Sequence, residues 1–93
     1  MTSYLLAYDL RNESGSHDYE PLWEELKRFG AQRTQYSLWL VATDAKAKPL
    51  HDHFKQYLDK DDRLWVNEVV KNKYYSTAIK GTNAWLDENP PVR

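Results

Sequence analysis

The sequence predicts one α+β domain that spans residues 1–93, with an antiparallel sheet that carries two helices on one face. Three observations predict this class. A chain of 93 residues suffices for one compact domain. Two stretches have the apolar spacing of three and four that is typical of helices, and apolar runs with the character of strands alternate with them. We expect the core over about 4–70 and a short strand and helix extension over 71–93.

The first strand and the first helix are the clearest elements. The apolar run Tyr4–Tyr8, closed by Asp9, is typical of a central strand covered on both faces. A polar loop over 11–17 follows, and Asp18 or Ser16 is placed to cap a helix near Asp18–Phe29. Pro21 lies in the first turn of this helix, and Gly30 is expected to end it. Glu24 and Arg28 are expected to pair on the solvent-exposed side. One apolar stripe faces the core: Tyr19, Leu22, Leu26 and Phe29.

The rest of the chain alternates in the same way. The stretch 32–43 is rich in β-branched and aromatic residues and predicts two strands with a bend at Tyr36-Ser37. A second helix is expected over Lys48–Leu58 and a strand over Arg63–Val70. Beyond them, Tyr74–Ile79 is predicted as a last strand and Thr82–Leu86 as one or two helical turns.

The order strand, helix, two strands, helix, strand predicts a ferredoxin-like βαββαβ sandwich. In this arrangement the second sheet face has no helix of its own chain to cover it. Asp9 shares strand parity with Leu5 and Ala7, so these three side chains are expected on one face. Because four Trp and seven Tyr are many for so small a core, we expect this face to be buried in a homodimer.

Several of these residues form a pattern that resembles the CRISPR-associated protein 2 family. Tyr8-Asp9 ends the first strand, Phe29-Gly30 ends the first helix, and Arg33 to Trp39 reads Arg-Thr-Gln-Tyr-Ser-Leu-Trp. An acidic turn, Asp61-Asp62, precedes the strand near Arg63. The sequence is still more similar to the branch of that superfamily that includes virulence-associated protein D and SinR-like proteins. The resemblance covers about residues 4–70.

The resemblance implies a homodimer whose two sheets face each other, and a magnesium ion, or manganese, held by Asp9 of each subunit for phosphodiester cleavage. It implies Tyr8 beside that carboxylate and Arg33 as a clamp on the phosphate. Arg11, Arg33 and Trp39 are the implied nucleic-acid contacts. The family carries basic residues soon after its aspartate, whereas this chain offers Arg11 and then 12–17 without Lys or Arg.

Each candidate residue has a structural alternative. Asp9 is also a strand-terminal aspartate suited to bonding backbone amides, and Arg33 is suited to a surface ion pair. Trp39 and Trp65 are aromatic surfaces for bases, but burial in the sheet or dimer is expected of them first. His51 and His53 stand two apart on a helix and diverge by about 200°, so they do not form a metal site.

Two further groups of side chains are candidates. His17 follows the loop after Asp9 and is a candidate general acid, although a solvated histidine at a helix start is the commoner case. Near the end, lysines and tyrosines form a basic and aromatic patch suited to a phosphate chain: Lys71, Lys73, Tyr74, Tyr75 and Lys80. Lysines on an exposed edge strand also deter aggregation. Ser37 has no histidine at a recognisable spacing and is interpreted as a bend residue.

Two function hypotheses follow. The first is a small dimeric Mg²⁺-dependent endonuclease that acts on RNA or DNA phosphodiesters. The second is a catalytically silent dimer of the same fold that binds nucleic acid or assembles with other proteins. RNA and DNA are both candidate substrates, and a larger protein of the CRISPR or toxin–antitoxin type is a candidate partner that the sequence does not identify.

Overall fold

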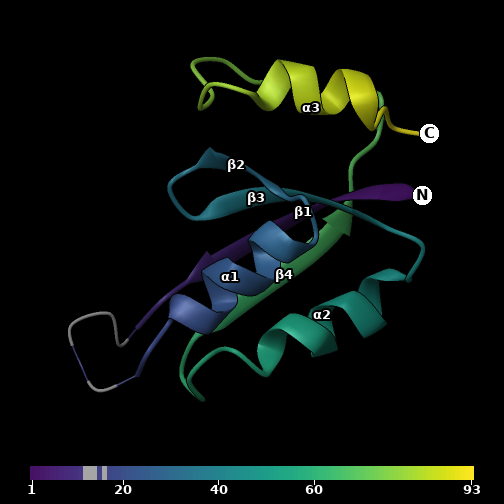
Figure 1. Ribbon diagram of the computed structural model, residues 1–93. Helices are drawn as coiled ribbons and strands as arrows, with labels where there is room; N and C mark the ends of the chain where they lie inside the picture. The colour runs from purple at the N-terminus through teal and green to yellow at the C-terminus, as the bar shows by residue number, and fades with distance from the viewer. Residues whose placement is uncertain (12–14, 16) are drawn as a thin grey trace.

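The computed structural model describes residues 1–11, 15 and 17–93. Its elements in chain order are β1 (Thr2–Asp9), α1 (Glu20–Arg28), β2 (Gln32–Gln35), β3 (Leu38–Thr43), α2 (Ala47–Lys55), β4 (Arg63–Glu68) and α3 (Thr82–Glu88) (Figure 1). The strands form one sheet in the order β2-β3-β1-β4, and every neighbouring pair is antiparallel. The predicted α+β class with a four-stranded antiparallel sheet is confirmed.

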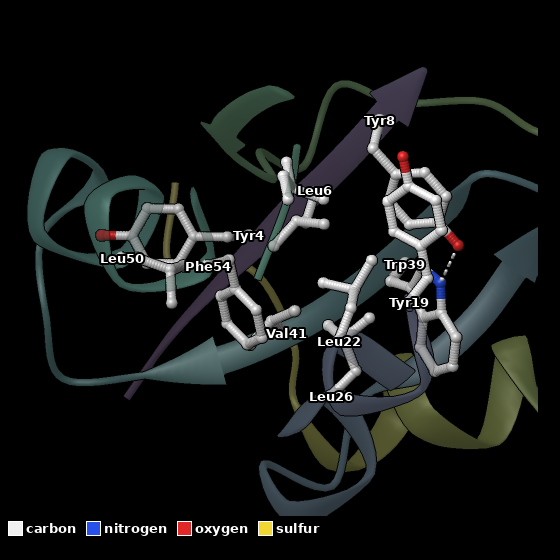
Figure 2. Close-up of a cluster of buried hydrophobic side chains, with 11 residues drawn as sticks. Tyr4, Leu6, Tyr8, Tyr19, Leu22, Leu26, Trp39, Val41, Leu50 and Phe54 are labelled. Atoms are coloured by element: carbon white, nitrogen blue, oxygen red, sulfur yellow. Dashed lines mark hydrogen bonds between the residues drawn. The ribbon is translucent and has the colours of Figure 1, made fainter. Parts of the chain in front are cut away.

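One face of the sheet carries the main core, and both α1 and α2 pack on it (Figure 2). Because side chains alternate along a strand, this face receives every second residue of the two central strands. The buried residues are Tyr4, Leu6 and Tyr8 of β1, Trp39 and Val41 of β3, Leu22 and Leu26 of α1, Leu50 and Phe54 of α2, and Tyr19 and Leu58 outside these elements. Each fully buried leucine contributes roughly 1.5–3 kcal/mol. The expectation of two helices on one face is confirmed.

The ends of α1 follow the chemistry of its flanking residues. The N-cap residue of α1 is Tyr19, which makes no side-chain cap hydrogen bond, so the expectation that Asp18 is the N-cap is wrong. Asp18 Oδ1 accepts the backbone N–H of Glu20, the first residue of the helix, at 3.0 Å. Gly30, with φ of 70°, ends it. The N–H of Ala31 donates to Leu26 O and that of Gly30 to Lys27 O, which is the Schellman pattern of helix termination. The alternative cap, Ser16, lies outside the described residues.

The second sheet face is partly covered, which corrects the expectation that no helix of the chain lies on it. Leu86 of α3 is buried against Leu40 and Val69, with Leu5 packed beside them. Trp85 Nε1 also donates to Gly30 O at 2.9 Å, which fixes α3 to the turn after α1. The helix of the predicted extension is therefore present, and it covers the side of this face on which β2 and β3 lie.

The predicted last strand over Tyr74–Ile79 is wrong. No strand lies between 69 and 81, all of which are described. One backbone bond, from Ile79 N–H to Thr34 O at 2.9 Å, joins this segment to the edge strand β2. Thr77 has φ of 56°, a left-handed conformation that interrupts any extended run. The segment thus leads from β4 to α3 as a loop (Figure 1).

Candidate functional site

Asp9 ends β1 on the second sheet face, opposite Arg63 of β4. Arg63 Nη1 donates to Asp9 Oδ2 at 2.7 Å, and both side chains are more than half exposed, at 68% and 54%. Asp9 is therefore accessible, and within the described part of the chain its partner is the cation Arg63 rather than the backbone amides expected as the alternative. An exposed ion pair of this kind contributes about 0–1 kcal/mol to stability, so it is weak enough to exchange.

Tyr8 lies on the other face of the sheet from Asp9. Its ring is 6% exposed within the core, and its hydroxyl accepts the indole N–H of Trp39 at 3.0 Å (Figure 2). The same hydroxyl accepts the indole N–H of Trp23 at 3.1 Å. Neighbouring residues of a strand point to opposite faces, so Tyr8 and Asp9 do not meet in one chain. The structure makes Tyr8 the polar centre of an aromatic cluster.

Arg33 stands apart from Asp9, because β3 separates its strand from β1. Its guanidinium lies over the rings of Tyr36 and Trp39, with 5.0 and 5.5 Å between the guanidinium carbon and the ring centroids, and Nε donates to Tyr36 O at 2.9 Å. Trp39 itself is buried at 5% exposure. The structure therefore does not gather Asp9, Tyr8 and Arg33 into one site within a chain.

The acidic turn before β4 forms a buried polar junction. Asp62 is 6% exposed and accepts three hydrogen bonds of 2.7 Å, from the backbone N–H of Arg11, the backbone N–H of Asp59 and the hydroxyl of Tyr19. Burial alone raises the pKa of the Asp62 carboxyl. The donors from Arg11, Tyr19 and Asp59 and the charge of His17 outweigh burial, and the net pKa is lowered. Sequence reasoning identified the turn but not its role.

Both ends of the β1–α1 connection are held at this junction. The Arg11 backbone is bound to Asp62, and His17 Nε2 lies 3.0 Å from Tyr57 O with its ring against Tyr19. These contacts tie His17 to the segment after α2. The polar residues 12–14 and 16, which the sequence assigns to this loop, lie outside the described residues.

A second polar cluster joins α1 to α2, and the sequence analysis missed it. Arg28 binds Glu25 through two hydrogen bonds of 2.7 Å, and His53 Nε2 contacts the same carboxylate. This corrects the expected Glu24–Arg28 pair. The hydrogen bonds from Arg28 lower the pKa of Glu25 from 4.5 to about 2, against the effect of burial and with a further contribution from His53. His51 pairs with Asp52 instead, so the two histidines diverge as expected.

Because of this cluster, we expect the fold to lose stability in acid. A carboxyl whose pKa is lowered in the fold stabilises it above the unfolded pKa, and that contribution is lost as pH falls from 4.5 towards about 2. Glu25→Gln should lower the free energy of unfolding at pH 7 by about 1–2 kcal/mol and flatten its decline in acid. Urea unfolding of the wild type, Glu25→Gln and the exposed neighbour Glu24→Gln between pH 2 and 7 measures this. Equal pH profiles for all three would contradict it.

The part of the second sheet face that α3 leaves uncovered is the most accessible apolar surface of the sheet. Trp65 is 70% exposed on β4, directly opposite Ala7, which in turn lies opposite Leu38. The Asp9–Arg63 pair borders them at the next position of the same face. We call Ala7, Leu38, Trp65, Asp9 and Arg63 the exposed sheet face. The expected burial of Trp65 in the sheet therefore does not occur within one chain.

The described donor groups of one chain do not by themselves form a magnesium site. Among residues 1–11, 15 and 17–93, no group of three or more His, Asp or Glu side chains is placed to hold a metal. Asp9 is a single carboxylate with a guanidinium at 2.7 Å, and Mg²⁺ prefers several oxygen ligands.

Comparison with known proteins adds no family assignment: no family model matches the chain, and no solved structure matches it. Across the described residues, no helix is long and apolar enough to cross a membrane.

Proposed function

We propose that this protein is a homodimeric nucleic-acid-binding module with a ferredoxin-like fold, similar to the CRISPR-associated protein 2 superfamily. The fold proposal is supported by the order β1-α1-β2-β3-α2-β4 and by the strand order β2-β3-β1-β4, with antiparallel neighbours throughout. A split βαβ arrangement has these features, with α3 as an addition at its end.

The observation that carries the dimer in this proposal is the exposed sheet face, whereas nucleic-acid binding rests on the resemblance to the CRISPR-associated protein 2 superfamily. Trp65 places a large aromatic surface in water beside Ala7 and Leu38, and removing apolar surface from water yields roughly 25 cal/mol per Å². A second copy of the chain can cover this surface with its own exposed sheet face. In such a two-fold symmetric dimer, the same residues of both subunits form the interface. Asp9 and Arg63 border this surface and are available to pair across the contact.

A Mg²⁺-dependent endonuclease is the second candidate, and one observation favours it. Asp9 is 54% exposed on the same face as Trp65, so a two-fold contact through this face brings two Asp9 carboxylates towards one axis. Two carboxylates form a better cation site than one, provided that the Arg63 pairs open. Asp9 of each subunit would hold the magnesium ion, which would supply a water of lowered pKa and positive charge beside a phosphodiester.

Light scattering tests the dimer. The wild type is expected at about twice the 11.1 kDa of one chain, and Trp65→Ser is expected to shift it to the monomer. Tyr36→Ser is the matched control, because Tyr36 is 69% exposed but lies in the β2–β3 turn. A wild-type mass near 11 kDa, or a dimer that Trp65→Ser leaves intact, would overturn the proposed interface.

A cleavage assay separates the module from the endonuclease. Labelled RNA and DNA are incubated with the wild type and with Asp9→Asn, in magnesium, in manganese and in chelator. The module predicts binding without cleavage in every buffer. Metal-dependent cleavage that Asp9→Asn abolishes would select the endonuclease. A magnesium-induced rise in melting temperature that Asp9→Asn loses would show that Asp9 is the ligand, because an ion that binds only the folded dimer stabilises it.

A further inference from the structure

The segment between β4 and α3 has a charge opposite to that of the rest of the chain. Residues 69–81 contain three lysines and no acidic residue, whereas the remaining residues have ten basic side chains against fourteen acidic ones. Lys71, Lys73 and Lys80 are all exposed, and within the described part of the chain none of them forms an ion pair. The segment is therefore a local positive surface on a chain with a net charge of −1.

The same segment forms an open hollow with the beginning of α3. Its volume is about 820 Å³, and residues 73–84 line it, including both Lys73 and Lys80. Small-molecule sites usually measure about 300–1,000 Å³, so the space is adequate for a nucleotide. Tyr75 donates its hydroxyl hydrogen bond to Asn83 Oδ1, which ties the wall of the hollow to the helix.

Tyr74 supplies an aromatic surface at this hollow. Its side chain is 95% exposed, the highest value among the large hydrophobic residues that lie on the described surface. Lys73 lines the same hollow, so the site offers both an aromatic ring and a cation. A base stacks on an exposed ring whatever its identity, and the phosphates that flank the base are attracted by the lysines.

We infer that this hollow binds single-stranded nucleic acid, with one base stacked on Tyr74 and the adjacent phosphates on Lys73 and Lys80. The inference rests on the proposed nucleic-acid-binding function and names the strand form and the residues. A single strand is required because stacking needs a base whose face is free, whereas the bases of a duplex are stacked on one another. The site is distinct from the exposed sheet face, since none of its lining residues belongs to that face.

Fluorescence anisotropy with a labelled oligothymidine of about twelve nucleotides tests the site, because single-strand sites span about 4–16 nucleotides. Tyr74→Ala should weaken binding about tenfold at constant salt, from the loss of one stacked base. Tyr74→Trp should retain binding. Tyr36→Ala is the matched control, because it removes an exposed tyrosine elsewhere.

The lysines are tested through the salt dependence. Each phosphate contact to a single strand contributes about 0.7 to the slope of log K against log salt. The double variant Lys73→Ala/Lys80→Ala should make that slope shallower by about 1.4, whereas Tyr74→Ala should leave it unchanged. Lys55→Ala/Lys60→Ala is the matched control, because both lysines are exposed outside this segment.

The outcomes separate this inference from the proposed function. A dimer whose binding is the same in Tyr74→Ala and Tyr36→Ala, or that prefers a hairpin duplex, overturns the site and leaves the dimeric module in place. A monomer that loses the oligonucleotide on Tyr74→Ala supports the site and overturns the dimer. A wild type that binds no oligonucleotide, single-stranded or duplex, overturns both.

Discussion

Replacing Asp62 with alanine should destabilise the fold by about 3–5 kcal/mol, a large part of the 5–15 kcal/mol typical of a domain. The carboxylate is buried and accepts hydrogen bonds from Tyr19 and from the backbones of Arg11 and Asp59. Alanine leaves all three donors without their acceptor at once. Urea unfolding at pH 7 measures the loss as a lower midpoint with an unchanged slope.

Asp61 provides the matched control, because it is the adjacent carboxylate but is exposed. Asp61→Ala should change the free energy of unfolding by less than about 0.5 kcal/mol. Similar losses in the two variants would show that the net charge of the turn matters rather than the buried junction.

Asp62 also makes the stability of the fold depend on pH. Its pKa is lowered in the fold from the ordinary 3.8, so its stabilising contribution is present above that value and is lost as pH falls below it. The acid decline of Asp62→Ala should therefore be shallower than that of the wild type. Thermal melts at pH 2–7 follow this decline.

The elements that the sequence predicted correctly depend on local patterns. The stripe of α1 and the apolar run of β1 place large side chains at fixed intervals, and those intervals decide which face is buried. Gly30 ended α1 as expected, because a glycine adopts the required positive φ at little cost. Strand parity placed Asp9 with Leu5 and Ala7 for the same reason.

The position of α3 could not be predicted because distant contacts fix it. Trp85 bonds to Gly30, 55 residues away, and Leu86 packs against Leu40 in the middle of β3. A helix of seven residues has too little periodicity to reveal which face it buries. The predicted strand over Tyr74–Ile79 followed β propensity, which fails where no neighbouring strand supplies a continuous ladder.

In the candidate site too, contacts between distant residues could not be predicted from local patterns. The resemblance placed Tyr8 and Asp9 in one site, although consecutive residues of a strand point to opposite faces. The partner of Arg28 was ambiguous, because Glu24 and Glu25 lie four and three residues before it and both spacings suit a helix. His53 resolves the ambiguity from 28 residues away by binding Glu25, a contact that has no signal in the sequence.

The aromatic cluster around Tyr8 carries the second large prediction. Tyr8→Phe keeps the ring and removes the one oxygen that accepts the indole N–H groups of Trp23 and Trp39. Each unsatisfied buried donor costs about 1–3 kcal/mol, so we expect a loss of about 2–4 kcal/mol, with most of it from the buried Trp39. Urea unfolding measures the loss.

Tyr4→Phe removes the same atom from the same strand face, but that hydroxyl donates to the carbonyl of Ala45, a part-buried contact. A carbonyl near the surface regains a partner from water, so this variant should lose only about 0.5–1.5 kcal/mol. The difference between the two phenylalanine variants isolates the cost of orphaned indole donors from the cost of losing any hydroxyl. Equal losses would contradict the aromatic cluster as described. If Tyr8→Phe instead kept its stability and lost nuclease activity, Tyr8 would have to reach the reacting groups, and the structural role assigned to it would be wrong.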